Sequence, residues 1–125
     1  MRNAIRTQIL DNVSGISEVW QPGMADKDVE KPYAVVKYSG EFQGNIRKSY
    51  DRTIEVWVYT DRVSYNNIDS IIEEVIDCLV NQTIVTENNE PFSLTCTGVS
   101  PDGYWDNDLE AVGKFAAFMY PLLRR

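Results

Sequence analysis

Histidine is missing altogether from this 125-residue sequence. Its absence removes the most versatile acid–base side chain near neutral pH, every Ser-His or Cys-His nucleophile, and most transition-metal sites. Glycine-rich phosphate loops and a nucleophile elbow are missing as well. Catalysis would have to rest on carboxylate, lysine, tyrosine or cysteine side chains alone. We therefore expect no enzyme, with no catalytic residue, no cofactor and no metal.

Cysteine and long apolar runs are also scarce. We expect the two cysteines, Cys78 and Cys96, to be reduced, buried and inert, because two thiols without histidine cannot complete a zinc site. No run approaches the length of a membrane span, and residues 1–6 lack the apolar core of a signal peptide. The sequence thus predicts a protein that is made in a cytoplasm and does not enter a membrane.

Positive charge is outnumbered, since 12 lysines and arginines face 19 aspartates and glutamates, for a formal net charge of −7. Such a surface repels the phosphate backbone, so sequence-reading binding to DNA or RNA is not expected. The same repulsion suits a protein that nucleic acid slides past without sticking.

Residues 49–80 carry the clearest pattern. In the first half, Ile54, Val56 and Val58 alternate with residues that point the other way, which predicts a strand with one buried face. In the second half, apolar residues recur at helical spacing opposite a mostly acidic set. This predicts an amphipathic helix of about four turns that begins near Asn67. The apolar set is Ile68, Ile71, Ile72, Val75, Ile76 and Leu79.

Weaker patterns lie on either side of this stretch. They predict a first helix over residues 2–13, a short strand over 16–20 and a longer strand over 32–39. Residues 40–48 would join that strand to the next one as the tip of a long hairpin. Two further segments, 83–86 and 92–97, are expected to pair as a second hairpin.

The last apolar stretch, residues 109–123, fits either a buried helix or a strand. Because Gly113 interrupts it and Phe115, Phe118 and Tyr120 favour extended backbone, we interpret residues 112–120 as a final strand. The order of elements predicts a single α+β domain over residues 1–125. Its mainly antiparallel sheet would contain the long hairpin, and the N-terminal helix and the central amphipathic helix would pack on one face.

Three groups of residues are candidates for a functional site. The acidic segment 102–110 has carboxylates that suit calcium, but its spacing does not match the twelve-residue calcium loop, so a surface loop is the favoured interpretation. Aromatic residues are enriched where partners bury each other, which makes Trp57, Tyr59, Tyr104 and Trp105 candidate interface anchors. The alternative is that the chain's own loops cover this sheet face. The basic pair at residues 47–48 is a candidate docking charge or an ordinary solvated one.

These features occur in an order that resembles a known family. A short strand ends in WQPG at residues 20–23, and a charged loop leads to KPYAVV at 31–36. After a glycine-bearing tip comes RTIEVWVYT at 52–60, and an amphipathic helix follows directly. In order and spacing, residues 2–85 resemble the tail terminator, or tail-completion, proteins of long-tailed bacteriophages and related prophages.

The resemblance implies a structural subunit that assembles as a hexameric ring, caps the finished tail tube and joins it to the head connector. Its partners would be other copies of itself, the major tail tube protein and the head–tail connector protein, at the head–tail junction of the virion. DNA would pass through without specific binding. Whether the isolated subunit is a monomer or a ring stays open.

A ring needs a head-to-tail interface that closes on itself. An exposed strand edge and the aromatic face around Trp57 and Tyr59 are candidates for it. The tip at residues 40–48 is a candidate arm for touching the tube or the connector, because it is rich in glycine and polar side chains. Its candidate contact residues are Gln43, Asn45, Arg47 and Lys48.

Two other functions remain open at this stage. One is another neck protein of the same virion, a head–tail stopper or adaptor. The other is a small dimeric α+β domain that binds a ligand or works as a cofactor-free enzyme, which would require an apolar pocket with converging polar groups.

Overall fold

The computed structural model describes residues 2–26, 28–39, 51–61, 65–80, 83–85, 89, 91–100 and 103–121. The helices are α1 (Arg2–Asn12) and α2 (Ile68–Val80), and a 3-10 turn, Tyr65–Asn67, precedes α2. The longer strands are β2 (Tyr33–Ser39), β3 (Asp51–Thr60), β6 (Thr95–Val99) and β8 (Ala111–Pro121). The short strands are β1 (Val19–Trp20), β4 (Ile84–Val85), β5 (Pro91–Phe92) and β7 (Tyr104–Asp106).

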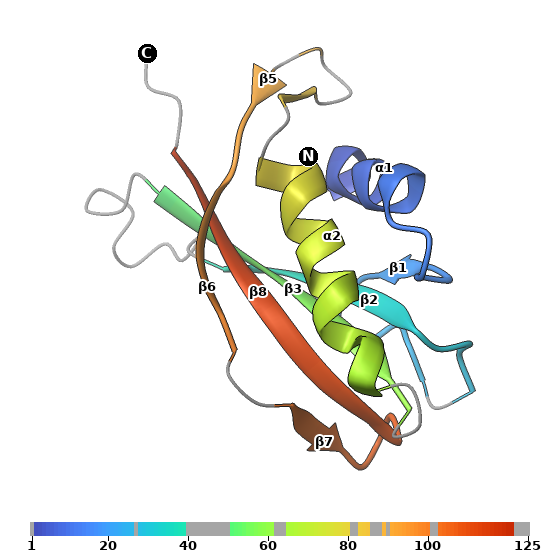
Figure 1. The fold of residues 1–125 in the computed structure, drawn as a ribbon. Helices are drawn as coiled ribbons and strands as arrows, with labels where there is room; N and C mark the ends of the chain where they lie inside the picture. Colours follow the sequence, from blue (N-terminus) through green and yellow to red (C-terminus); the bar gives the residue numbers. More distant parts are fainter. Residues whose placement is uncertain are drawn as a thin grey trace.

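Within these described residues, the main sheet has six strands in the order β1-β2-β3-β8-β6, and β7 also pairs with β8. The β1–β2 pair is parallel, and the other pairs of this sheet are antiparallel. Both helices lie on the same side of the sheet (Figure 1). The chain is therefore α+β with a mixed, mostly antiparallel sheet, which confirms the predicted class.

The α2 helix begins at Ile68, as its pattern predicts, and its buried side chains face the sheet. Ile76, which was predicted to be buried, is only half-buried, whereas Cys78 is buried as expected. The buried set is Ile68, Ile71, Ile72, Val75, Cys78 and Leu79. Asp69 lies in the first turn, where the helix dipole favours a negative charge, and its Oδ1 accepts a hydrogen bond of 2.7 Å from Lys114 Nζ on β8.

The core lies between the helices and the inner face of β3. Ile54, Val56 and Val58 are almost fully buried on that face, as their alternation predicts. Ile5 and Ile9 of α1 pack into the same cluster. Because β3 pairs with β2 on one side and with β8 on the other, it is the centre of the sheet. Residues 40–50, which join β2 to β3, lie outside the described residues, and so do Gln43, Asn45, Arg47 and Lys48.

The C-terminal half departs from the prediction in two places. Residues 92–97 do not form one strand, because Pro91–Phe92 pairs with β4 whereas Thr95–Val99 pairs with β8. Leu94, buried between them, marks the change of partner. The second departure is Tyr104–Asp106, which was expected to be loop but forms β7 along β8. Both differences have the same cause: β8 is long, and its backbone groups need hydrogen-bond partners on both sides.

The final apolar stretch is a strand, which confirms the interpretation over the helical alternative. It runs the full length of β3, and Phe118 fills the core opposite Ile54. Neither cysteine is bonded to another. Cys78 is buried, and burial raises the pKa of its thiol to about 11. Cys96 is only half-buried, because it lies on β6 at the edge of the sheet, so the expectation of burial is wrong for this residue.

The part of the chain that the structure describes has no helix with the length and apolar character needed to cross a membrane.

Candidate functional site

The outer face of the sheet, turned away from the helices, carries a second hydrophobic cluster. Tyr33, Val35 and Tyr59 lie at its centre, and Ala25, Val29 and Leu109 pack against it from the connecting loops. Tyr33 is 0% exposed and Tyr59 is 5% exposed. The chain's own loops therefore cover this end of the face, which agrees with the alternative interpretation for Tyr59.

An aromatic stack crosses the strands on this face. The ring centroids of Tyr33 and Tyr59 are 5.4 Å apart, and those of Tyr59 and Trp57 are 5.9 Å apart. The Trp57 ring then meets Phe115 at 4.6 Å and Tyr104 at 6.1 Å. The stack follows the strand register, since Val35, Trp57 and Phe115 are cross-strand neighbours. Aromatic pairs at such distances add stability beyond the area they bury.

Trp57 is held in place from two sides. Its Nε1–H donates a hydrogen bond of 3.0 Å to Glu55 Oε1. The Lys37 ammonium lies 4.6 Å from the centre of the indole ring, within the range of a cation–π interaction. The Trp57 side chain is half-buried, so one part of the indole ring contacts the aromatic stack and another part contacts solvent. Trp57 is thus a rigid aromatic side chain on the boundary between the covered and the open part of the face.

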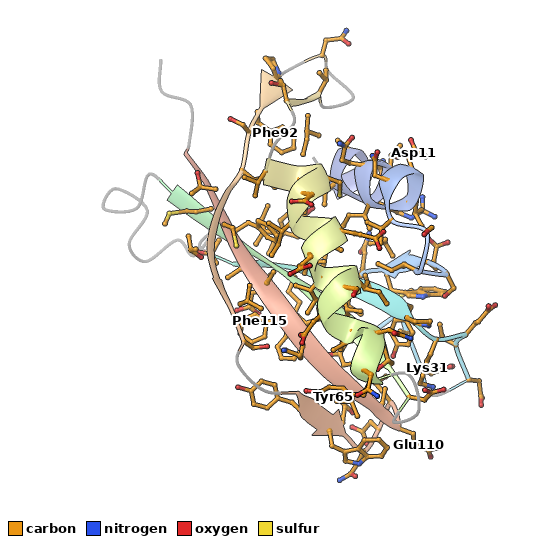
Figure 2. The ribbon with its side chains drawn as sticks, in the orientation of Figure 1. Asp11, Lys31, Tyr65, Phe92, Glu110 and Phe115 are labelled. Atoms are coloured by element: carbon orange, nitrogen blue, oxygen red, sulfur yellow. The ribbon has the colours of Figure 1, made fainter. Side chains whose placement is uncertain are left out.

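The open part continues onto β7. Tyr104 is 49% exposed and Trp105 is 44% exposed, so both present large aromatic area to solvent. They point to opposite faces of the sheet, because Tyr104 is paired with Gly113 and Trp105 with Val112. The Trp105 Nε1–H donates to Asn107 Oδ1 at 2.6 Å, and the Gly103 N–H donates to the Tyr65 hydroxyl at 3.0 Å. Figure 2 shows Tyr65 and Glu110 at this same end of the molecule.

Chemistry at the covered end is limited. Burial raises the pKa of Tyr33 and of Tyr59 to about 12, and the nearby Asp106 carboxylate adds to the shift of each. Both phenols therefore stay protonated at neutral pH and are poor bases or nucleophiles. Asp106 itself accepts a hydrogen bond of 3.0 Å from the Leu109 N–H, which fixes the turn before β8.

The acidic segment does not form a metal site as far as the described residues show. In the described ranges, no three carboxylate or thiol side chains are placed so that they could hold one metal ion. Asp106 and Asn107 instead stabilise the turn and the Trp105 side chain. Asp102 lies outside the described residues.

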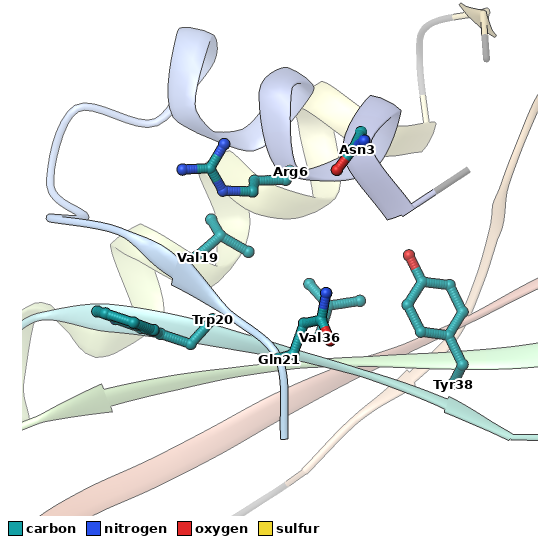
Figure 3. A pocket seen from close by; sticks show the side chains of 7 residues that line it. All are labelled: Asn3, Arg6, Val19, Trp20, Gln21, Val36 and Tyr38. Atoms are coloured by element: carbon teal, nitrogen blue, oxygen red, sulfur yellow. The ribbon is translucent and has the colours of Figure 1, made fainter. Parts of the chain in front are cut away.

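A hollow lies at the opposite edge of the sheet, between α1 and the β1–β2 pair (Figure 3). It has a narrow part of about 30 Å³ and an open part of about 360 Å³. Arg6 lies at its rim and pairs with Glu18 at 2.8 Å. The hydrogen bond from the Val19 N–H, followed by that from Arg6, lowers the pKa of the Glu18 carboxyl. The narrow part is lined by Asn3, Arg6, Val19, Trp20, Gln21, Val36 and Tyr38.

The structure brings together some of the predicted interface residues and separates others. Trp57 and Tyr104 are neighbours, Tyr59 lies buried beside them, and Trp105 projects to the other face of the same edge. Sequence reasoning missed Phe115 and Lys37, which complete the surroundings of Trp57. The alternation of β8 could have placed Phe115 on the outer face, but only the register shows that it lies beside Trp57.

Comparison with protein-family models found no match to this chain, and comparison with curated protein sequences found none.

Proposed function

We propose that this chain is a structural subunit of a long-tailed bacteriophage or prophage: a tail terminator that caps the tail tube as a hexameric ring and joins it to the head connector. The observation that carries the proposal is the aromatic surface where half-buried Trp57 and exposed Tyr104 lie side by side, with exposed Trp105 on the opposite face of the same edge. Aromatic side chains dominate the binding energy of many protein interfaces. An interface between subunits accounts for their exposure.

The rigidity of Trp57 supports a role in assembly. Binding costs free energy when side chains must be ordered, so a residue that is already fixed loses less on association. Glu55 and Lys37 fix the indole before any partner arrives. A catalytic site would instead need groups whose pKa values are tuned toward neutrality, whereas the clustered phenols are shifted away from it.

Charge supports the same proposal. The exposed side of α2 carries four carboxylates, Asp69, Glu73, Glu74 and Asp77, within an overall net charge of −7. Phosphate contacts generate most of the affinity of proteins for DNA, and an anionic surface offers few of them. A subunit of this kind lets DNA pass through a ring at the head–tail junction without binding it.

The contacts between the ring and its partner proteins would be made by residues 40–48. We assign Gln43, Asn45, Arg47 and Lys48 to an arm that touches the tail tube protein or the head connector. Polar side chains and a positive pair suit a contact that forms late and must not stick to other subunits beforehand. The virion is assembled in the bacterial cytoplasm, and the ring forms there on the tail tube. The isolated subunit therefore need not be hexameric.

Electron microscopy of particles made without this gene tests the proposal. We expect DNA-filled heads and tails that are not joined, because the connecting ring is missing. Expression of the wild-type chain from a plasmid should restore joined particles, and this serves as the control. Normal particles from the deletion would contradict the proposal.

A further inference from the structure

The main sheet has two edges that differ in how they are covered. At one edge, β1 pairs with β2 only at Ala34 and Val35. From Val36 onward, β2 therefore has no neighbouring strand on that edge among the described residues. The hollow of Figure 3 lies at that place. At the other edge, β6 and β7 follow each other along β8 and are the last strands of the sheet in the described part of the chain.

Exposed apolar side chains gather at these two edges. Among the described residues, Val99, Tyr104 and Trp105 lie on β6 and β7, and each is more than two-fifths exposed. Met24, which is 66% exposed, lines the open part of the hollow beside Trp20 at the opposite edge. Exposed apolar area of this kind marks contact surfaces. The remaining large exposed apolar residue is Val85 on β4, outside both edges.

The β6 edge lacks the usual protection against pairing. Edge strands commonly carry charged residues that prevent association with other strands. Residues 93–100 contain no charged residue, although 25% of the whole chain is charged. A bulge between Cys96 and Gly98 is the one protective feature of this strand in the described structure.

Arg6 and Glu18 both line the open part of the hollow, and Arg6 offers a donor group to carboxylates at the other edge. The turn after β7 carries Asp106, Asp108 and Glu110, and none of these three carboxylates is buried. At the rim of the hollow, the Arg6 side chain is 47% exposed although it pairs with Glu18. A guanidinium has five N–H donors, so Arg6 can bind a second carboxylate while it keeps the first.

We propose that the β6–β7 edge of one copy of this chain binds the β1–β2 edge of a second copy. Val99 and Trp105, which point to the same face of the sheet, meet the hollow beside Trp20 and Met24, and the carboxylates after β7 approach Arg6. The two surfaces are different, so the contact is head-to-tail, as closure of a ring requires. Only the closure of a ring rests on the proposed function. The contact between the two edges can be tested with the isolated protein.

Paramagnetic relaxation between two copies tests the contact even when it is weak. One sample carries a nitroxide on Thr95→Cys in a Cys96→Ser background, and it is mixed at high concentration with ¹⁵N-labelled wild-type chain. Cys78 is buried with a raised thiol pKa, so it stays unlabelled. We expect intermolecular broadening of the Gln21 and Val36 amide signals. The control places the nitroxide on Glu73→Cys of α2, from which these amides should not broaden.

Two outcomes would overturn the inference. One is the absence of intermolecular broadening from the Thr95→Cys label. The other is broadening centred on Trp57 and Phe115, which would show that the outer faces of two copies pack against each other instead.

Complementary variants give a second test, read by sedimentation. Val99→Lys blocks one edge and Met24→Lys blocks the other, so each variant alone should associate with itself about tenfold more weakly. A mixture of the two keeps one intact pair of edges and should form a 1:1 dimer that grows no further. A mixture as weak as its components contradicts the head-to-tail contact. If the dimer forms but particles without the gene are normal, the edge contact stands and the proposed function fails.

Discussion

Tyr59 lies directly over Gly113, because a Cβ atom placed on Gly113 would come within 2.6 Å of Tyr59 Cε1. The same atom would lie 3.2 Å from Trp57 Cε3. Tyr59 of β3 and Gly113 of β8 are cross-strand partners, so the aromatic rings occupy the space that a side chain at residue 113 would fill. The absence of a side chain at Gly113 lets the aromatic stack lie flat on the sheet.

Gly113→Ala should therefore lower the free energy of unfolding by about 1–3 kcal/mol, the usual cost of inserting a carbon into a packed site. Denaturant unfolding measures the change. Gly98→Ala on β6 is the matched control, because a Cβ there meets no atom within 4 Å, and it should change stability little. Equal effects of the two substitutions would show that the close approach at Gly113 does not matter.

The strongly patterned parts of the sequence predicted the fold best. The alternation around Val56 and the helical spacing around Ile72 each have one buried face, and the structure confirms both. The sequence could not show that residues 92–97 divide between two partners, since pairing with β8 depends on a strand far away in the chain. For the same reason the strand at Tyr104–Asp106 was missed: its three residues carry too little pattern.

The candidate site was predictable only in part. Aromatic residue types pointed to Trp57 and Tyr104, and the register brings them together. The burial of Tyr59 was left open by the sequence, because it depends on loops at Ala25 and Leu109 that have no periodicity. The hollow beside Trp20 was not predicted, since it arises where β1 stops short along β2.

Ile72→Asp should abolish folding. Ile72 is 3% exposed between α2 and the sheet, and an unpaired carboxylate cannot be solvated there. Far-UV circular dichroism and thermal melting measure the result. The neighbouring Glu73→Asp, on the exposed side of the same helix, is the control and should stay folded. An unchanged melting temperature for Ile72→Asp would mean that the other helix face is buried.

Stability should fall as the pH rises from 10 to 12. Tyr33 and Tyr59 have an ordinary pKa of 10.0 when unfolded and a pKa of about 12 in the folded chain. Between these values the folded state binds more protons than the unfolded state, so the free energy of unfolding decreases with pH. Well below pH 10 both phenols are protonated in the folded and the unfolded state, so they do not change the free energy of unfolding with pH. Denaturant midpoints measured across this range check the expectation.

Phenylalanine variants separate the two tyrosines in that experiment. Tyr33→Phe removes a buried hydroxyl with no hydrogen-bond partner among the described residues, so at neutral pH it should be neutral or stabilising. Both Tyr33→Phe and Tyr59→Phe should flatten the alkaline slope. If neither variant changes the slope, these tyrosines are not the groups that titrate.

Deleting residues 43–47 should leave the subunit folded and stop tails from joining heads. These residues belong to the proposed arm and lie outside the residues that the structure describes. Circular dichroism checks the fold, and counts of infectious particles check joining. A glycine-serine segment of equal length is the matched control for the connection, and it should also fail to join. Infectious particles from either variant would contradict the role of the arm.

We propose that this chain works as a ring between tail and head, through surfaces that meet other proteins. Cryo-electron microscopy of the particles that contain it is the decisive measurement. We expect six copies in a ring at the head-proximal end of the tail tube, with the β6–β7 edge of each copy against the β1–β2 edge of the next. Intact particles that lack the chain at the head–tail junction would contradict it.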